Sequence, residues 1–162
     1  MQPQDLMDAP DRERLLLCLR AELPGIVAGR PVMLAYLYGS VAEGRPRRSS
    51  DIDIALVLTP GIALAAYDRM LLELRIAAEV EERCGVREAD VRSVDAAPLM
   101  VQGRVVSEGI LLYSRDEDFR VRYEVYTRKR FFDYQPVAEA MRQVFFERVR
   151  ADLRRRGVRS DG

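Results

Sequence analysis

A glycine-serine turn followed by two closely spaced aspartates constrains this chain more than any other feature of its sequence. The apolar segment 32–38 ends at Gly39-Ser40, and after a polar spacer a second apolar segment opens with Asp51 and Asp53, each followed by an isoleucine. Such alternation is typical of a β-strand with one face in the core. Side chains two residues apart in a strand share a face, so the two carboxylates are predicted to lie together, away from the isoleucines.

Two carboxylates this close repel each other unless a cation lies between them. Mg²⁺ prefers such oxygen ligands and is usually completed by substrate phosphates. Asp90, in a segment 88–94 of alternating charged and apolar residues, is the candidate third carboxylate, and Glu88 on the same face is the alternative. The chain has no histidine, so a carboxylate or a metal-lowered pKa must activate a hydroxyl nucleophile. We therefore predict that Asp51, Asp53 and Asp90 are the catalytic and Mg²⁺-binding residues.

The turn at Gly39-Ser40 could bind the phosphates of a nucleotide. Glycine allows the backbone to approach a phosphate closely, and Ser40 at a helix start offers a hydroxyl, free N–H groups and a favourable dipole. Structural alternatives exist for each part. Ser40 and Glu43 form the S-x-x-E pattern of a capping box, which satisfies helix-end donors without any ligand. Asp51 and Asp53 could equally be solvated carboxylates at an exposed strand start.

Composition limits the remaining classes of function. The 26 basic and 26 acidic residues among 162 balance each other, so we expect no nucleic-acid partner. No apolar run approaches the roughly 20 residues that span a membrane. Cys18 and Cys84 lack a nearby second cysteine, and we expect buried thiols in a reducing compartment, the cytoplasm. The chain length suits one domain with its own core.

Periodicity and turn signals predict a fold of mixed class. Strands are expected over 32–38, 51–58, 88–94 and 110–113, and helices over 11–23, 64–84, 98–108, 116–133 and 136–155. In the helix expected over 64–84, the predicted core-like positions are Met70, Leu74, Ala77, Ala78 and Glu81. We predict an α+β (α/β-type) fold: a small mixed β-sheet flanked by helices, with a two-helix C-terminal extension. The boundaries are a core over 1–113, an extension over 114–156 packed on it, and a tail over 157–162.

The complete motif is similar to the signature of the DNA polymerase beta-type nucleotidyltransferase superfamily. It reads Gly39-Ser40-x-Ala42-x-Gly44-x5-Ser50-Asp51-x-Asp53. The small size of the chain resembles the minimal nucleotidyltransferase (MNT) branch of that superfamily. The similarity is strong over about 32–58. A weaker match over 86–113 resembles the third-carboxylate strand of the branch, its following helix and a terminal short strand.

The resemblance implies roles for these residues and a biological context. Gly39 and Ser40 would bind the nucleotide triphosphate, Asp51 and Asp53 would bind Mg²⁺, and Asp90 would complete the triad. Members of the branch commonly act as antitoxins paired with a HEPN-type RNase toxin. Where active, they transfer AMP from ATP to a tyrosine of that toxin and so silence it. Two alternatives stay open: transfer to a small molecule of the antibiotic type, and an inactive antitoxin that acts by binding alone.

Two further features bear on these alternatives. The position of Glu43 is often arginine in active antitoxins, and a carboxylate there opposes ATP binding unless it caps the helix. The extension 114–156 is rich in phenylalanine and tyrosine and is larger than the sheet needs. Part of it is expected to contact a partner protein, the alternative being that two helices simply pack over the sheet.

Overall fold

The computed structural model describes residues 9–44 and 51–157. Its elements are α1 (Ala9–Val27), β1 (Val32–Tyr38), α2 (Gly39–Ala42), β2 (Ile52–Leu58), α3 (Ala66–Cys84), β3 (Ala89–Ser93), α4 (Leu99–Glu108), β4 (Ile110–Ser114) and α5 (Glu117–Gly157). The spacer 45–50, expected to be a loop and containing Ser50, lies outside the described residues, as do residues 158–162 of the tail. The order of helices and strands confirms the α+β class.

The four strands form one mixed sheet in the order β3-β2-β1-β4. Strand β1 is antiparallel to both β2 and β4, whereas β2 and β3 are parallel. In this register Asp53 lies opposite Tyr38 of β1 on one side and opposite Asp90 of β3 on the other. Directly opposed side chains in a sheet share a face, so the sheet brings these three residues to the same side.

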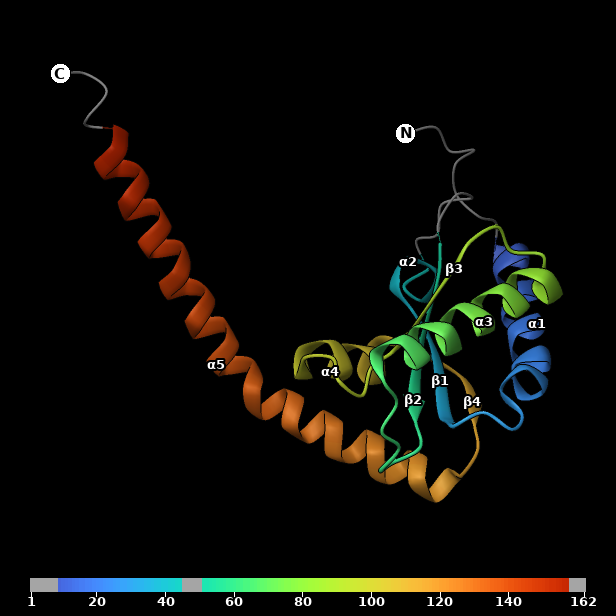
Figure 1. The fold of residues 1–162 in the computed structure, drawn as a ribbon. Helices are drawn as coiled ribbons and strands as arrows, with labels where there is room; N and C mark the ends of the chain where they lie inside the picture. The colour runs from blue at the N-terminus through green and yellow to red at the C-terminus, as the bar shows by residue number, and fades with distance from the viewer. Residues whose placement is uncertain (1–8, 45–50, 158–162) are drawn as a thin grey trace.

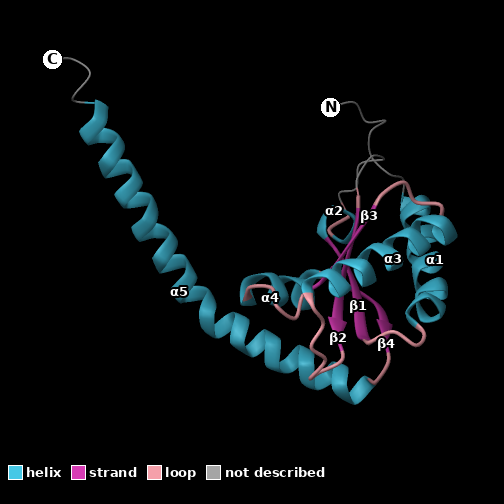
Figure 2. Ribbon diagram, viewed as in Figure 1, coloured by secondary structure: helices cyan, strands magenta, loops and turns pink. Residues whose placement is uncertain are grey.

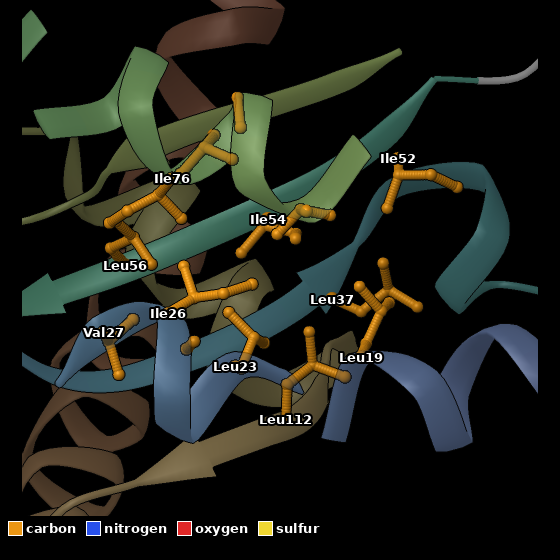
Figure 3. Packing of buried hydrophobic residues seen from close by; sticks show 14 of the residues in the cluster. Leu19, Leu23, Ile26, Val27, Leu37, Ile52, Ile54, Leu56, Ile76 and Leu112 are labelled. Atoms are coloured by element: carbon orange, nitrogen blue, oxygen red, sulfur yellow. The ribbon is translucent and has the colours of Figure 1, made fainter. Parts of the chain in front are cut away.

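Helices cover both faces of the sheet (Figures 1 and 2). Helices α1 and α3 pack on the face that carries Ile52 and Ile54, and Figure 3 shows Leu19, Leu23 and Ile26 of α1 meeting the strand residues there. The opposite face carries Tyr36 and packs against α4 and the start of α5. The isoleucines therefore face a buried core, and the carboxylates between them face the other side, as the alternation indicates.

Helix α1 is longer than the sequence predicts. The prediction ended it at 23 because Pro24-Gly25 follows, but the helix continues to Val27 with Pro24 inside it. Ile26 and Val27, beyond the proline, are fully buried against the sheet. Burial of such side chains contributes about 1.5–3 kcal/mol each, enough to offset the roughly 3 kcal/mol that an internal proline costs.

Helix α3 confirms its predicted end, but of its predicted buried face only Ala77 is buried. Gly85 follows it in the left-handed conformation, φ +63°, which suits a glycine cap. The buried residues are Glu73, Ile76, Ala77 and Val80, whereas Met70 and Leu74 of the predicted stripe are exposed. Glu73 takes a core position because its Oε1 accepts hydrogen bonds from Ser93, from the backbone N at 2.8 Å and from Oγ at 2.6 Å.

The two cysteines are joined rather than free. Cys18 of α1 and Cys84 of α3 form a disulfide, with Cα atoms 5.8 Å apart. The prediction of two buried thiols is therefore wrong. It relied on the distance between them in the sequence, but the packing of α1 against α3 brings the two positions within bonding range.

The C-terminal extension is one helix, not the two predicted over 116–133 and 136–155. Helix α5 runs from Glu117 to Gly157 with Pro136 inside it, and in Figure 1 it changes direction partway and leaves the body of the molecule. A proline inside a helix removes one backbone hydrogen bond and clashes with the preceding turn, which can kink a helix without ending it. None of the described helices, α5 included, is apolar enough over a sufficient length to cross a membrane.

Only the first half of α5 packs on the core. Thr127 and Phe131 are buried there, and Phe131 lies so close to Gly103 of α4 that a Cβ on that glycine would overlap its ring. From Phe132 to Arg155 every residue is exposed except the partly buried Ala138 and Ala151. This corrects the expectation that the whole extension 114–156 packs on the core: the second half, which we call the arm (residues 132–155), extends away from it.

One buried polar group ties α5 to the sheet. The Tyr36 hydroxyl donates to Glu124 Oε1 at 2.9 Å, and Glu124 also pairs with Arg120 at 3.1 Å and Arg128 at 3.3 Å. Burial, with Glu124 beside it, raises the pKa of Tyr36 far above its usual value. We expect Tyr36→Phe to lower the free energy of unfolding by about 1–2 kcal/mol in urea denaturation, because a buried carboxylate loses a donor. Tyr126→Phe, at an exposed position, is the control, and equal stability of both variants would contradict this role.

Candidate active site

Asp53 lies at the centre of the candidate site. It sits in β2 on the face opposite to Ile52 and Ile54 and is partly exposed. Its pKa is raised, first by burial and then by the negative charges of Asp90 and Asp51. The structure therefore brings the three aspartates singled out by the sequence into electrostatic contact.

Asp90 faces the site from the neighbouring strand but is engaged by an arginine. Its Oδ1 accepts a hydrogen bond from Arg92 Nε at 2.8 Å, and both side chains are about half exposed, 46% and 63%. An exposed ion pair of this kind is worth about 0–1 kcal/mol. Asp90 can therefore turn toward a cation beside Asp53 at little cost.

Asp51 and Glu88 form a second acidic pair at the same end of the sheet. Both are exposed, and the Ile52 backbone N donates to the Glu88 carbonyl at 3.0 Å, which keeps the segments that carry them side by side. The pKa of Glu88 is raised, first by a hydrogen bond with Asp51 and then by its charge. Glu88, the alternative third carboxylate from the sequence, therefore also belongs to this acidic group.

The carboxylates suit a hard cation, although they are not drawn together around one point. Within residues 9–44 and 51–157 no three candidate ligand side chains are gathered closely enough to hold a metal, since Asp51 turns to Glu88 and Asp90 to Arg92. The donor set consists of carboxylate oxygens alone, as Mg²⁺ prefers. The pKa of Asp53 is raised mainly by burial and that of Glu88 mainly by its hydrogen bond with Asp51, but neighbouring negative charges add to both shifts, and a cation would relieve that part. The residues thus fit Mg²⁺.

The glycine-serine turn lies directly against Asp53. Gly39 has φ +73°, and a Cβ at this position would overlap Asp53 Oδ2. Glycine is therefore needed both for the backbone conformation and for the close approach. It begins the short helix α2, whose other end is fixed by Arg12, which donates to the carbonyls of Val41 at 2.8 Å and Ala42 at 3.0 Å.

The predicted capping box does not form. The residue that precedes α2 is Tyr38, without a side-chain cap hydrogen bond among the described residues, and Ser40 is the second residue of the helix. The Glu43 carboxylate instead lies 3.9 Å from Arg104 Nη2 of α4. Ser40 is therefore not the N-cap of α2, so the capping box does not account for this serine and its hydroxyl is not used as a cap.

Two glycines allow the contact with Asp53 to be tested. Gly39 and Gly44 share φ +73°, but no described atom lies within 4 Å of a Cβ placed at Gly44. Gly44→Ala should cost about 1–2 kcal/mol of unfolding free energy for the backbone conformation alone. Gly39→Ala should cost about 1–3 kcal/mol more, because Asp53 must move. Urea denaturation measures both, and equal losses would contradict the close packing of Gly39 on Asp53.

A cleft opens beside the turn on the same face of the sheet. Its volume is about 290 Å³ and it lies between the β1–α2 junction and α4. Its lining residues are Tyr38, Gly39, Glu43, Val101, Arg104, Val105 and Glu108. Tyr38, which lines the cleft, is the residue opposite Asp53 in the sheet register, and its pKa is raised by burial and by the charges of Asp53 and Asp90. Sequence reasoning missed the cleft, because no local pattern relates α4 to α2.

Comparison with known proteins agrees with the motif. Residues 25–118 match the family described as "Polymerase beta, Nucleotidyltransferase". A crystal structure of a toxin–antitoxin complex with AMP-PNP contains a chain 23% identical, with a TM-score of 0.60, over 80% of this chain and 97% of that one. A crystal structure of a mutant MntA-HpeT toxin–antitoxin complex contains a chain 21% identical, with a TM-score of 0.60, over 80% of this chain and 97% of that one. A crystal structure of a protein from Shewanella oneidensis is 20% identical, with a TM-score of 0.54, over 81% of this chain and 95% of that one. These likenesses show the fold, and no curated protein matches the chain.

Proposed function

Because the chain belongs to the polymerase beta-type nucleotidyltransferase family, we propose that it is a Mg²⁺-dependent protein adenylyltransferase. In this proposal it acts as an antitoxin that transfers AMP from ATP to a tyrosine hydroxyl of a partner HEPN RNase toxin. The observation that carries the proposal is the position of Asp53, flanked by Asp90 and Asp51 and packed against Gly39. Carboxylates beside a phosphate-binding turn are the components that phosphoryl transfer needs.

Each residue has a chemical task in this reaction. Asp51 and Asp53 would hold Mg²⁺, and the ion would supply positive charge to offset that of the phosphates and the leaving pyrophosphate. Gly39 and Ser40 offer backbone N–H groups and a hydroxyl to the triphosphate. Asp90 accepts the proton of the tyrosine hydroxyl as its oxygen bonds to the α-phosphorus. The bond from that phosphorus to the bridging oxygen breaks, and pyrophosphate leaves.

Two observations support a protein partner and an adenine nucleotide. Similar solved chains come from toxin–antitoxin complexes, one of them with AMP-PNP. The arm of α5 presents many exposed apolar side chains, and those at least one-third exposed are Phe132, Tyr134, Val137, Met141, Val144, Phe145, Phe146, Val149 and Leu153. A large exposed apolar surface is typical of a protein-binding site. We propose that the toxin covers the arm.

Two other functions remain alternatives. Transfer to a small antibiotic-type molecule needs a substrate-binding domain, and beyond β4 the described chain provides a single helix. A catalytically inactive antitoxin was suggested by Glu43, whose charge opposes that of ATP. Its ion pair with Arg104 offsets part of that charge, so we favour the active form.

Radiolabelled ATP distinguishes these functions. The chain is incubated with Mg²⁺ and ATP labelled at the α-phosphate, together with a small helical protein of the HEPN type or with aminoglycosides. Label on the helical protein, and none from ATP labelled at the γ-phosphate, is the expected result. Label on an aminoglycoside would favour the small-molecule enzyme, and binding of the helical protein without labelling would favour the inactive antitoxin.

A further inference from the structure

We propose that Arg104 of α4 binds the triphosphate of the nucleotide, exchanging Glu43 for a phosphate oxygen when the nucleotide enters. This inference deepens the proposed function and rests on it. Arg104 does not belong to the glycine-serine motif. It lies in α4, the helix that follows the strand of Asp90. Arg104 lies on the wall of the cleft of about 290 Å³ between α2 and α4.

The wall that carries Arg104 is held firmly. Gly103, the preceding residue, packs against Phe131 with no room for a Cβ, and Arg128 Nη2 donates to the Val106 carbonyl at 3.0 Å. At the end of α4 a Cβ on Gly109 would come within 3.1 Å of the Leu37 carbonyl oxygen of β1. Helix α4 is therefore fixed both to α5 and to the strand that leads into the turn, so the distance from Arg104 to α2 is set by the fold.

The present partners of Arg104 are weak enough to be exchanged. Its Nη2 lies 3.9 Å from Glu43 Oε1 and its Nε lies 3.5 Å from Glu108 Oε2, with side-chain exposures of 62%, 45% and 53%. Ion pairs so exposed contribute little. A guanidinium forms two parallel hydrogen bonds with phosphate oxygens, and such charge-assisted bonds are the stronger ones. A triphosphate carries more negative charge than either glutamate and would compete for Arg104.

Gly39 connects the cleft to the carboxylates. The same residue lines the cleft and packs on Asp53. A nucleotide whose metal lies at Asp53 must pass this glycine, and the side of α2 that it then meets carries Glu43 facing Arg104. Val101 and Val105 form the apolar part of the lining, and Arg104 is the basic residue in it. The α2 side of the cleft carries the negative charge of Glu43. The positive charge that a triphosphate needs is therefore supplied by Arg104 on the α4 side.

The test is calorimetric titration of the full chain with Mg²⁺-ATP and, separately, with adenosine. Arg104→Ala should weaken ATP binding by about 10- to 100-fold, the scale of a lost charge-assisted hydrogen bond. Glu43→Gln should tighten ATP binding by several-fold, because it removes the competitor. A damaged fold does not produce tighter binding, so this second variant guards against misfolding. Adenosine affinity should stay unchanged in both. Arg75→Ala, an exposed arginine on α3 across the sheet, is the control.

The outcomes separate this inference from the function it rests on. If the wild-type chain binds no Mg²⁺-ATP, both are overturned. If it binds ATP and Arg104→Ala binds it equally well, the assignment of Arg104 is wrong while the proposed function stands. An equal loss of ATP and adenosine affinity would also overturn the assignment, because Arg104 would then contact the nucleoside rather than the phosphates.

Discussion

Asp53→Asn is expected to abolish nucleotide transfer while leaving the fold at least as stable as in the wild type. Loss of a charged group that contacts the reacting centre commonly costs on the order of 10²–10³-fold in rate, and loss of a Mg²⁺ ligand should cost at least as much. Asp51→Asn should have the same direction of effect. Rates of label transfer from ATP to the acceptor measure the loss. Asp68→Asn, at an exposed position in the first turn of α3, is the control.

The stability of the same variant provides a second, independent result. Burial and the charges of Asp90 and Asp51 raise the pKa of Asp53. A carboxyl whose folded pKa lies above its unfolded value, about 3.9, stabilises the fold at low pH and loses that contribution as pH rises through the folded pKa. The ionised carboxylate is therefore a cost at neutral pH, which the amide removes. The free energy of unfolding, measured in urea, should therefore fall less steeply between pH 4 and pH 7 in Asp53→Asn than in the wild type. Full transfer activity or a sharply lower stability would contradict this assignment.

Removal of the arm, by ending the chain at Phe131, is expected to abolish binding of the partner protein without unfolding the core. Residues 132–155 are almost entirely exposed, so their loss should change the free energy of unfolding by less than about 1 kcal/mol. Apolar anchors at the centre of an interface are worth about 2 kcal/mol or more each. Loss of several should weaken toxin binding by more than about 100-fold, measured by calorimetry or co-purification.

A point variant tests the same surface without shortening the chain. Met141→Asp places a charge on the apolar side of the arm, whereas Gln143→Asp places it roughly 200° around the helix. Both positions are exposed in the free chain, so neither should change its stability. Only Met141→Asp should weaken toxin binding. If Met141→Asp and the shortened chain bind the toxin normally but lose self-association in sedimentation, the arm joins copies of this chain and the partner assignment is wrong.

Much of the fold and site could be predicted because short-range patterns determine them. The alternation of Asp51 and Asp53 with isoleucines determines which face of β2 is polar, and Gly39 ends β1 because a left-handed turn must follow. The strand with Asp90 aligns with β2 so that Asp90 lies opposite Asp53. The parallel pairing itself needs no special signal, because α3 provides the crossover between these strands.

The remaining features depend on contacts between distant segments. Pro24 and Pro136 stay within helices, the first because Ile26 and Val27 are buried and the second because the arm is free to bend. Glu73 is buried because Ser93, in another element, supplies donors. The disulfide and the pairing of Glu43 with Arg104 likewise join elements far apart in the sequence. Contacts of this kind cannot be predicted from the periodicity of a single segment of the sequence.

The most direct measurement is the intact mass of the HEPN-type partner protein after incubation with this chain, Mg²⁺ and ATP. The partner's mass should increase by one or more AMP units, located on a tyrosine by fragmentation, and its RNase activity should be lost. Neither the mass increase nor the loss of RNase activity should appear with Asp53→Asn in this assay. An unmodified partner that the wild-type chain nevertheless binds and silences would contradict the account and identify an antitoxin that acts by binding alone.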